Sequence, residues 1–326
     1  MEKRIVGSLL VSFLLVLVCI SFGSSWAAEK YPSRPIELIC PYAPGGIADI
    51  ITRAIAKALP KLVGVSVVSV NKPGGAGTIA ANYLINSSPD GYTIMYGFDT
   101  HYINLLLGQA TYKLEDVRII AKFSDSNFVM AVAADSPWKT FQETIDYAKK
   151  NPGIVTFGSP PGGTANNILM ELLKKEAKLN MVNVPFPGDA QIIPAILGKH
   201  ISMGNLTLPG SKPLADAGKI RILFSFCSVA DFGLDRSILD WPTLFKEPPP
   251  FISNGYVFAH PKTPEETVKV LEGALEKLMK DPEFIQEVKK LNVYASFIDG
   301  KTFTEKYLPQ KMATLKGVLK DMGLIK

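Results

Sequence analysis

The sequence predicts an α/β protein of two lobes, each a doubly wound and mostly parallel sheet, with a cleft between them. The 326-residue chain is too long for one typical core and fits two domains of about 150 residues each. Apolar runs typical of strands alternate with amphipathic runs typical of helices, which is the pattern of parallel sheets. In addition, the tripeptide Pro-Gly-Gly stands between a strand-like and a helix-like run three times, at 44–46, 73–75 and 161–163.

The first 27 residues have the layout of a secretory signal. Lys3 and Arg4 precede an apolar stretch at 5–22, and Ser25 and Ala27 are the small residues expected before a cleavage site. An uncleaved membrane anchor is the alternative, because the stretch is nearly long enough to span a bilayer. We expect cleavage after Ala27 and a secreted mature protein.

The elements alternate in order along the mature chain. In the first half, strands are predicted at 36–41, 65–70 and 93–98, and helices at 48–62 and 78–86. A second unit begins after Ala121, with strands at 127–133, 155–157, 180–184 and 220–226 and helices at 140–149, 166–178 and 190–197. Residues 228–255 are predicted to be irregular, and a strand at 257–259 and helices at 264–280 and 303–322 complete the chain.

Composition excludes several classes of function. The formal charge of +5 is modest, and without a dense Lys/Arg cluster it argues against a nucleic-acid partner. Cys40 and Cys227 are the cysteines left after signal removal, and they lack metal-type spacing. We expect two buried free thiols, although the pair could form a disulfide in an oxidising compartment.

The Pro-Gly-Gly corners suggest anion binding. Proline stops the strand and glycine permits a tight turn. The following helix then presents unpaired N–H groups and the positive end of its dipole, which bind anions without a basic side chain. At the first corner Tyr42 would wall a pocket, and the Gly46 and Ile47 amides would face a carboxylate. Asp49 has a plainer interpretation, as a first-turn acid that stabilises a helix entry.

The other two corners differ from each other. The third adds the hydroxyls of Ser159 and Thr164, which can bond a ligand oxygen or cap the helix. In the second, residues 75–80 match the dinucleotide fingerprint G-x-G-x-x-A, and Asp99 ends the next strand. Residues 71–74 separate strand from glycines, however, and spoil the tight turn that the fingerprint requires. We expect the second corner only to pack its helix on the sheet.

Catalytic constellations are scarce. The histidines at 101, 200 and 260 are widely separated, and there is no G-x-S-x-G elbow. The sequence therefore predicts no enzyme, no metal and no cofactor. His101 follows a strand end, where open α/β sheets bind ligands, and it is a candidate contact on that ground.

Several motifs occur in an order typical of one family. They are Y-P-S-R-P-I at 31–36, P-Y-x-P-G-G-x-x-D at 41–49, N-K-P-G-G-A-G at 71–77 and S-P-D-G-Y-T at 88–93. T-H-Y-I-N at 100–104, G-S-x-x-x-G-T at 158–164, V-P-F-P-G at 184–188 and the terminal helices follow. Over essentially the whole mature chain, this sequence resembles the extracytoplasmic receptors of tripartite tricarboxylate transporters, the Bug family.

The resemblance implies a periplasmic solute-binding protein of the Venus-flytrap type, type II-like. After the signal peptide at 1–27, lobe 1 would comprise 28–125 plus 229–326, and lobe 2 would comprise 126–228. A small organic acid would lie between the lobes, held by loop amides, hydroxyls and waters. The positions carried over place Tyr42, Gly46, Ile47 and Asp49 on one side, Ser159, Gly163, Thr164 and Asn167 on the other, and Thr100, His101 and Phe186 nearby.

The function implied is capture of a carboxylate and its delivery to the permease subunits of a membrane transporter, by a receptor that we expect to be a monomer. A partner of a sensor kinase would differ only in the recipient. A secreted NAD-dependent oxidoreductase is the alternative from another class.

Some positions depart from the family pattern in lobe 2. Pro160 and Pro161 remove two potential N–H donors, Pro187 stands where a Lys is frequent, and Asn167 where a His is frequent. Ser202 occupies a usual Asp position, and residues 204–206 lack the typical acid. These departures favour a more apolar monocarboxylate over a di- or tricarboxylate.

Overall fold

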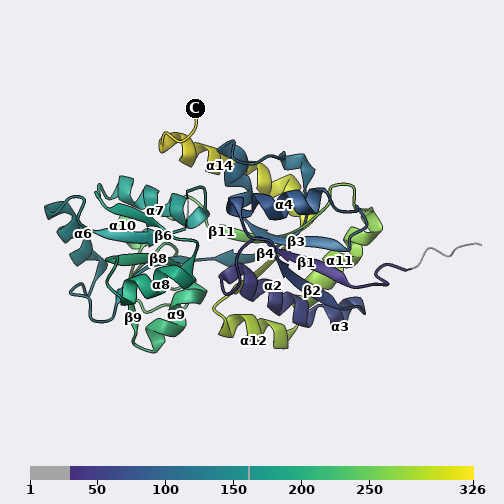
Figure 1. Cartoon of the computed structure of the whole chain (residues 1–326), viewed down its shortest axis with the longest axis horizontal. Helices are drawn as coiled ribbons and strands as arrows, with labels where there is room; N and C mark the ends of the chain where they lie inside the picture. Colours follow the sequence, from purple (N-terminus) through teal and green to yellow (C-terminus); the bar gives the residue numbers. More distant parts are fainter. Residues whose placement is uncertain (1–29, 161) are drawn as a thin grey trace, which may run out of the picture.

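A computed structural model describes residues 30–160 and 162–326. It contains two six-stranded sheets, each covered by helices, which form two lobes side by side (Figure 1). The predicted signal segment and Pro161 of the third corner lie outside the described residues. The predicted two-lobed α/β architecture is confirmed.

The sheet of lobe 1 is mixed. Its strands, in spatial order, are β12 (Tyr294–Asp299), β4 (Arg118–Ser126), β11 (Ser253–Ala259), β3 (Thr93–Phe98), β1 (Ile36–Cys40) and β2 (Val67–Asn71). Strand β1 pairs in parallel with β2 and β3, whereas the pairings of β11 with β3, β11 with β4 and β12 with β4 are antiparallel. The expectation of a mostly parallel sheet therefore fails in this lobe, because β4 leads the chain out of the lobe and β11 brings it back.

The sheet of lobe 2 is parallel in three of its five pairings. Its strands, in spatial order, are β10 (Leu239–Asp240), β9 (Ile220–Ser225), β5 (Phe128–Ala133), β8 (Met203–Thr207), β6 (Thr156–Ser159) and β7 (Val182–Pro185). Strand β10 lies in a segment that the sequence assigns to lobe 1. The predicted return to lobe 1 at residue 229 is therefore too early, since β10 pairs with β9 of lobe 2.

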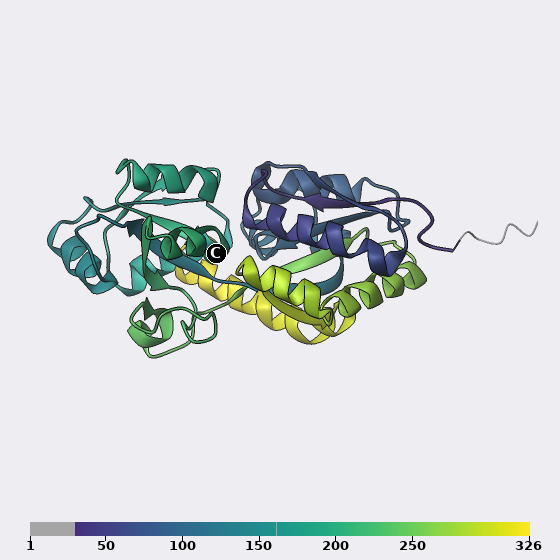
Figure 2. The same ribbon diagram turned by 90° about the horizontal axis from the view of Figure 1, so that it is seen from below.

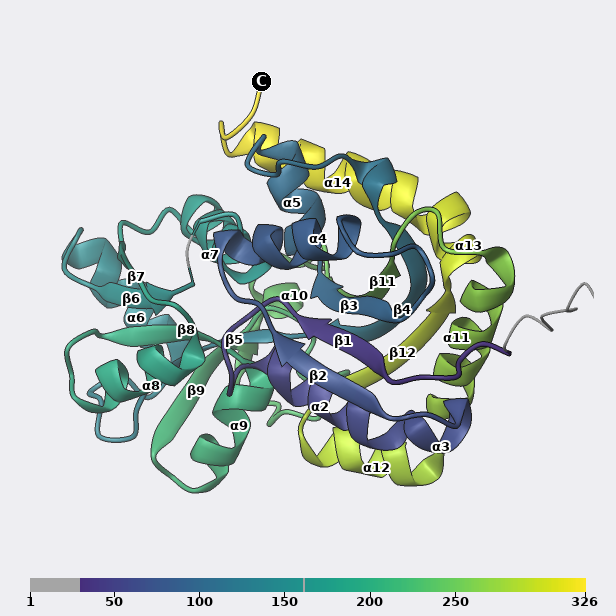
Figure 3. The same cartoon turned by 45° about the vertical axis from the view of Figure 1, so that its right-hand side comes forward.

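Helices cover both faces of the lobe 1 sheet (Figure 3). On one face lie α2 (Ile47–Ala58), α3 (Pro60–Val63), α11 (Glu265–Leu278) and α12 (Pro282–Lys290). On the other lie α4 (Thr78–Ile85), α5 (Thr100–Leu106) and α14 (Leu308–Asp321). Short helical turns at Gly75–Gly77, Leu114–Asp116, Gly300–Thr302 and Phe303–Tyr307 connect them. Each face buries its own apolar cluster, and Leu275 and Leu315 are fully buried examples on the two sides.

Lobe 2 carries α6 (Phe141–Lys150), α7 (Ala165–Glu176), α8 (Asp189–Leu197), α9 (Leu208–Asp216) and α10 (Trp241–Phe245). Helix α6 begins with a complete capping box, in which Thr140 Oγ1 accepts from the Glu143 N–H and the Glu143 carboxylate accepts from the Thr140 N–H. Helix α7 buries Leu169 and Leu173 in the core, as its apolar spacing predicts.

The lobes are joined by strand crossovers and by the C-terminal helix. Only Asn127 separates β4 from β5, and its side chain bonds Ser225 Oγ and the Cys227 N–H of lobe 2. Helix α14 runs from lobe 1 towards lobe 2 (Figure 2), where Lys175 of α7 donates to the Asp321 carbonyl. The cavity described below lies between these two lobes, and Asn127 is the shortest of their connections.

Several elements escaped prediction because polar groups interrupt their apolar pattern. Strand β4 carries Lys122 and Asp125, which pair at 2.6 Å with the Lys122 side chain almost fully buried. Strand β8 buries Asn205, and β12 is only half-buried. The predicted irregular segment 228–255 also contains β10, α10 and the start of β11.

Cys40 and Cys227 are buried free thiols, as expected. Among the described residues, no helix combines the length and the apolar character needed to cross a bilayer.

Candidate functional site

A cavity of about 450 Å³ lies between the lobes. Lobe 1 contributes the corner around Tyr42 and Gly46, the loop at 73–77, Phe98 and Thr100. Lobe 2 contributes Phe128, the start of α7 and the start of α8. Ser126 and Ser253, at the strand crossovers, complete the lining.

Four helices begin at this cavity. The lining includes Gly46 and Ile47 at the start of α2, Gly77 before α4, Thr164 and Ala165 at the start of α7, and Gly188 and Asp189 at the start of α8. The first N–H groups of a helix have no acceptor within it, and the helix dipole is positive at this end. Four such ends at one cavity favour an anion.

The first and third corners share one backbone geometry. Gly45 and Gly163 both have φ of +88°, a left-handed conformation that favours glycine. Each precedes an extended residue, Gly46 or Thr164, from which a helix starts. The two glycines do not occupy the same place in the Pro-Gly-Gly motif. Gly45 is the first glycine of its copy, whereas Gly163 is the second.

Asp49 is turned away from the cavity. Its carboxylate accepts from the Gly45 N–H at 3.0 Å, from Arg53 Nε at 2.9 Å and from Asn71 Nδ2 at 3.0 Å. Burial alone would raise the pKa of this carboxyl, but the hydrogen bonds from Arg53, Gly45 and Asn71 lower it. Asp49 therefore braces the corner and does not line the cavity.

Asn167 has the same position in α7 that Asp49 has in α2, the third residue of the helix. Its Nδ2 donates to Ser159 Oγ at 3.0 Å, and Ser159 Oγ donates in turn to Asn183 Oδ1. Asn167 and Ser159 are both buried and do not line the cavity. Their placement therefore does not support the prediction that they contact a ligand.

His101 lies behind the cavity wall. Its ring stacks on Tyr112 with centroids 4.6 Å apart, and Nδ1 is 2.8 Å from the Tyr112 hydroxyl. Burial lowers the pKa of this histidine to about 3, so the ring is neutral. His101 thus packs against Tyr112 outside the cavity lining, and this placement does not support its predicted role as a ligand contact.

Of the eleven residues predicted for the site, five line the cavity: Tyr42, Gly46, Ile47, Thr100 and Thr164. The six others, Asp49, His101, Ser159, Gly163, Asn167 and Phe186, do not. Phe186 packs instead in the lobe 2 core beside Gly158. A Cβ at Gly163 would lie 2.9 Å from Gln109 Oε1 of lobe 1, so this glycine permits a close approach between the lobes.

The second corner was predicted only to pack, but the structure also places it at the cavity. Pro73, Gly74, Gly75, Ala76 and Gly77 all line the cavity. Besides the dinucleotide-like glycines, this segment has the same simple signal as the other two corners, a glycine-rich turn before a helix. Asp189, Phe98, Phe128 and Ser253 were also missed, although Gly188-Asp189 has the small-residue-plus-acid signature of a helix start.

The dinucleotide interpretation is further weakened by Asp99. This fully buried carboxylate accepts from the Asn254 N–H and the Tyr256 hydroxyl and pairs with Lys311 at 2.7 Å. Because it is fully buried and held by three protein partners, it is not presented to a ribose hydroxyl.

The cavity contains little charge. Among the described residues that line it, none is Lys, Arg or His, and the titratable ones are Tyr42 and Asp189. Burial raises the pKa of Tyr42 to about 12, so its hydroxyl remains a donor. Ser253 Oγ is buried and lacks a hydrogen-bond partner among the described residues, which leaves it available to a ligand. The described chain also offers no cluster of His, Cys, Asp and Glu that could hold a metal.

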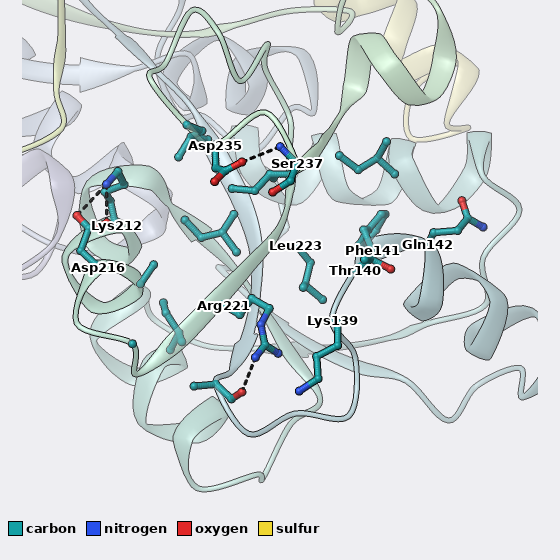
Figure 4. A pocket seen from close by; sticks show the side chains of 18 residues that line it. Lys139, Thr140, Phe141, Gln142, Lys212, Asp216, Arg221, Leu223, Asp235 and Ser237 are labelled. Carbon is teal, nitrogen blue, oxygen red and sulfur yellow. Dashed lines mark hydrogen bonds and ion pairs between the residues drawn. The ribbon is translucent and has the colours of Figure 1, made fainter.

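A second hollow, of about 690 Å³, lies on lobe 2 alone (Figure 4). Most of its charged groups are engaged with protein partners: Lys212 with Asp216, Asp235 with the Ser237 N–H, and Arg221 with the Trp138 and Ala134 carbonyls. Lys139 also lines this hollow. It has neither the second lobe nor the converging helix ends of the interlobe cavity. The interlobe cavity is therefore the candidate functional site.

Two lobes with mixed sheets, and an interlobe cavity lined by helix starts, define the class of two-lobed solute-binding proteins, and comparison with known proteins agrees. Residues 51–324 match the family model described as "Tripartite tricarboxylate transporter family receptor", and the chain belongs to this family. A UPF0065 protein of Bordetella pertussis is 30% identical over 268 residues, covering 81% of this chain and 82% of its own.

Solved structures with the same fold include the "periplasmic binding protein BugD", with a TM-score of 0.82 and 22% identity over 91% of this chain and 100% of that one. "R. palustris Rpa4515 with adipate" also has a TM-score of 0.82, with 23% identity over 90% of this chain and 98% of that one. The chain is therefore a solute receptor and not an enzyme, in a family whose members are periplasmic binding proteins.

Proposed function

We propose that this receptor binds a small carboxylate in the interlobe cavity and delivers it to the membrane subunits of a tripartite transporter. The observation that carries the proposal is the convergence of four helix N-termini on one cavity whose described lining has no basic side chain. Backbone N–H groups in such an arrangement hold a carboxylate without requiring a cation.

The contacts follow from the lining. The N–H groups of Ile47 and Ala165, one from each lobe, are the first of their helices and would bond the carboxylate oxygens. The hydroxyls of Tyr42, Thr100 and Ser253 can supply further donors. A structural relative contains adipate, which agrees with carboxylate as the ligand class.

Closure of the lobes on the ligand would produce the form that the permease recognises. The single-residue crossover at Asn127 gives the lobes a short connection about which they can rotate, and ligand contacts from both lobes would favour the closed state. We expect a monomer in the periplasm after cleavage of residues 1–27, testable by light scattering and by mass spectrometry of the mature N-terminus.

Isothermal titration against mono-, di- and tricarboxylates tests the proposal. We expect at least one acid to bind with a Kd well below 1 mM. Absence of binding across the panel by a folded protein would contradict a carboxylate receptor.

A further inference from the structure

One acidic side chain lines the cavity, and it belongs to Asp189, the first residue of α8. Its Oδ2 accepts from the Thr207 N–H at 3.0 Å and from the Thr207 hydroxyl. Gly210 also lies against this oxygen, because a Cβ there would come within 2.5 Å of Oδ2. The other oxygen, Oδ1, makes no hydrogen bond or ion pair within the described residues.

Within the described residues no Lys, Arg or His pairs with this carboxylate, and the positive charge nearest to it is the partial charge at the start of α8. Strands β5, β6 and β8, which pack against α8, carry no titratable side chain. On α9, Lys212 is engaged with Asp216, and across the cavity Tyr42 is neutral. Burial raises the pKa of Asp189 to about 6 despite the two bonds from Thr207, as expected for a carboxylate partly removed from water without a counter-charge.

A purely structural role does not account for the whole side chain. Bracing the end of β8 through Thr207 uses Oδ2 only, and a neutral Asn or Ser could accept the same bonds. Removing a charge partly from water costs free energy unless another charge or a hydrogen-bond donor pairs with it. In the interlobe cavity, that partner can come from the ligand.

We propose that Asp189 makes the cavity selective for a carboxylate that also carries an ammonium group, and that it excludes acids whose second group is another carboxylate. The inference rests on the proposed function, because helix ends such as those of α2 and α7 must hold the ligand carboxylate. Oδ1 then accepts a charge-assisted hydrogen bond from the ammonium. Phe98, Phe128 and Tyr42 provide an apolar wall for the carbon chain between the two groups.

Titration of matched acids at pH 7.5 tests this selectivity. One set is 6-aminohexanoate, hexanoate and adipate, which differ in carrying an ammonium, nothing or a second carboxylate at the far end. A second pair, leucine and 4-methylpentanoate, places the ammonium beside the carboxylate. We expect the wild-type protein to bind at least one amino acid about tenfold or more tightly than its amine-free counterpart, and adipate most weakly.

Asp189→Asn should abolish the preference and admit adipate, since it removes the charge and leaves an acceptor for Thr207. Asp146→Asn, at an exposed acid of lobe 2 outside the cavity whose side-chain partner is the neutral Gln142, is the matched control and should change nothing. Thermal melts establish that both variants fold.

Two outcomes overturn the inference, and they are distinguishable. If hexanoate or adipate binds as tightly as the amino acids and Asp189→Asn changes neither, Asp189 does not select the ligand, while the carboxylate function stands. If the folded wild-type protein binds none of these acids nor any other carboxylate, the proposed function falls and the inference falls with it.

Discussion

Two aspartates in the first turns of helices at the interlobe cavity have opposite environments. Asp49, third in α2, has three hydrogen-bond donors, one of them the Arg53 guanidinium, and a lowered pKa. Asp189, first in α8, has Thr207 alone, no cation, and a raised pKa. The former faces into the lobe, whereas the latter lines the cavity.

The difference follows from position in the helix. A third residue can fold back over the helix start, where Gly45 and Asn71 meet the Asp49 carboxylate. A first residue lies at the mouth of the helix, beside whatever the helix end faces. The same residue type near the same kind of corner thus stabilises the fold in one lobe and is available to a ligand in the other.

The largest expected effect is on stability. At pH 7.5, Asp49→Asn should lower the free energy of unfolding by roughly 1–3 kcal/mol, because Arg53 loses its ionic acceptor and Gly45 its charged one. Since the pKa of Asp49 is lowered in the fold, its contribution is present above the unfolded value of about 3.9 and is lost as pH falls through the folded value.

Asp189→Asn is the matched comparison and should leave stability unchanged or raise it, since it removes an unbalanced charge. Urea unfolding of both variants without ligand measures the contrast. If both variants lost the same free energy of unfolding, the two aspartates would play the same role in stability.

The next effect is on affinity at the lobe 1 corner. Ile47→Pro removes one N–H from the start of α2 while keeping a residue that is favoured at the first helical position, after an extended Gly46. We expect about tenfold weaker carboxylate binding by titration calorimetry, equal to about 1.4 kcal/mol. Ile47→Ala, which keeps the N–H, controls for the lost side chain. If both variants bind equally, the backbone of α2 does not hold the ligand.

Affinity should also depend on pH, in opposite directions for two ligands. As Asp189 loses its proton through about pH 6, an amine-free acid should bind more weakly, by about three- to tenfold between pH 5.5 and 8. Over the same range an amino acid should bind more tightly, by about two- to fourfold, because about a quarter of Asp189 is already ionised at pH 5.5. Simple carboxylic acids, with pKa values of about 4 to 5, are largely ionised throughout this range. Asp189→Asn should flatten both profiles in the same titrations. Wild-type slopes of equal sign would contradict the role of Asp189.

The smallest effect concerns Thr207. Thr207→Val deletes the hydroxyl that donates to Asp189 and caps α9, so the Asp189 carboxylate is less stabilised and the midpoint of the pH profile should move upward. Affinities near pH 6 should change by about twofold, while Thr207→Ser should match the wild type. A midpoint that moves downward, or an equal shift in Thr207→Ser, would show that the hydroxyl does not act on Asp189.

Much of the fold was predictable because strands such as β3 and helices such as α7 have uninterrupted periodicity. Strands were missed where buried polar side chains interrupt the apolar pattern, so that the segment has the composition of a loop. Lys122 in β4 and Asn205 in β8 are examples. At the site, the sequence identified the corners but not which side chains face the cavity. Asp49 belongs to the family motif at 41–49 yet turns inward, whereas Asp189 carries only the general signature of a helix start yet lines the cavity. Orientation depends on partners distant in sequence, such as Asn71 and Thr207.

The central claim is that helix ends, without basic side chains, hold a carboxylate between the lobes. A crystal structure with the tightest-binding acid tests it most directly. We predict carboxylate oxygens at about 3 Å from the N–H groups of Ile47 and Ala165, the first residues of α2 and α7. A ligand carboxylate paired with a Lys or Arg, or bound outside the interlobe cavity, would contradict the claim.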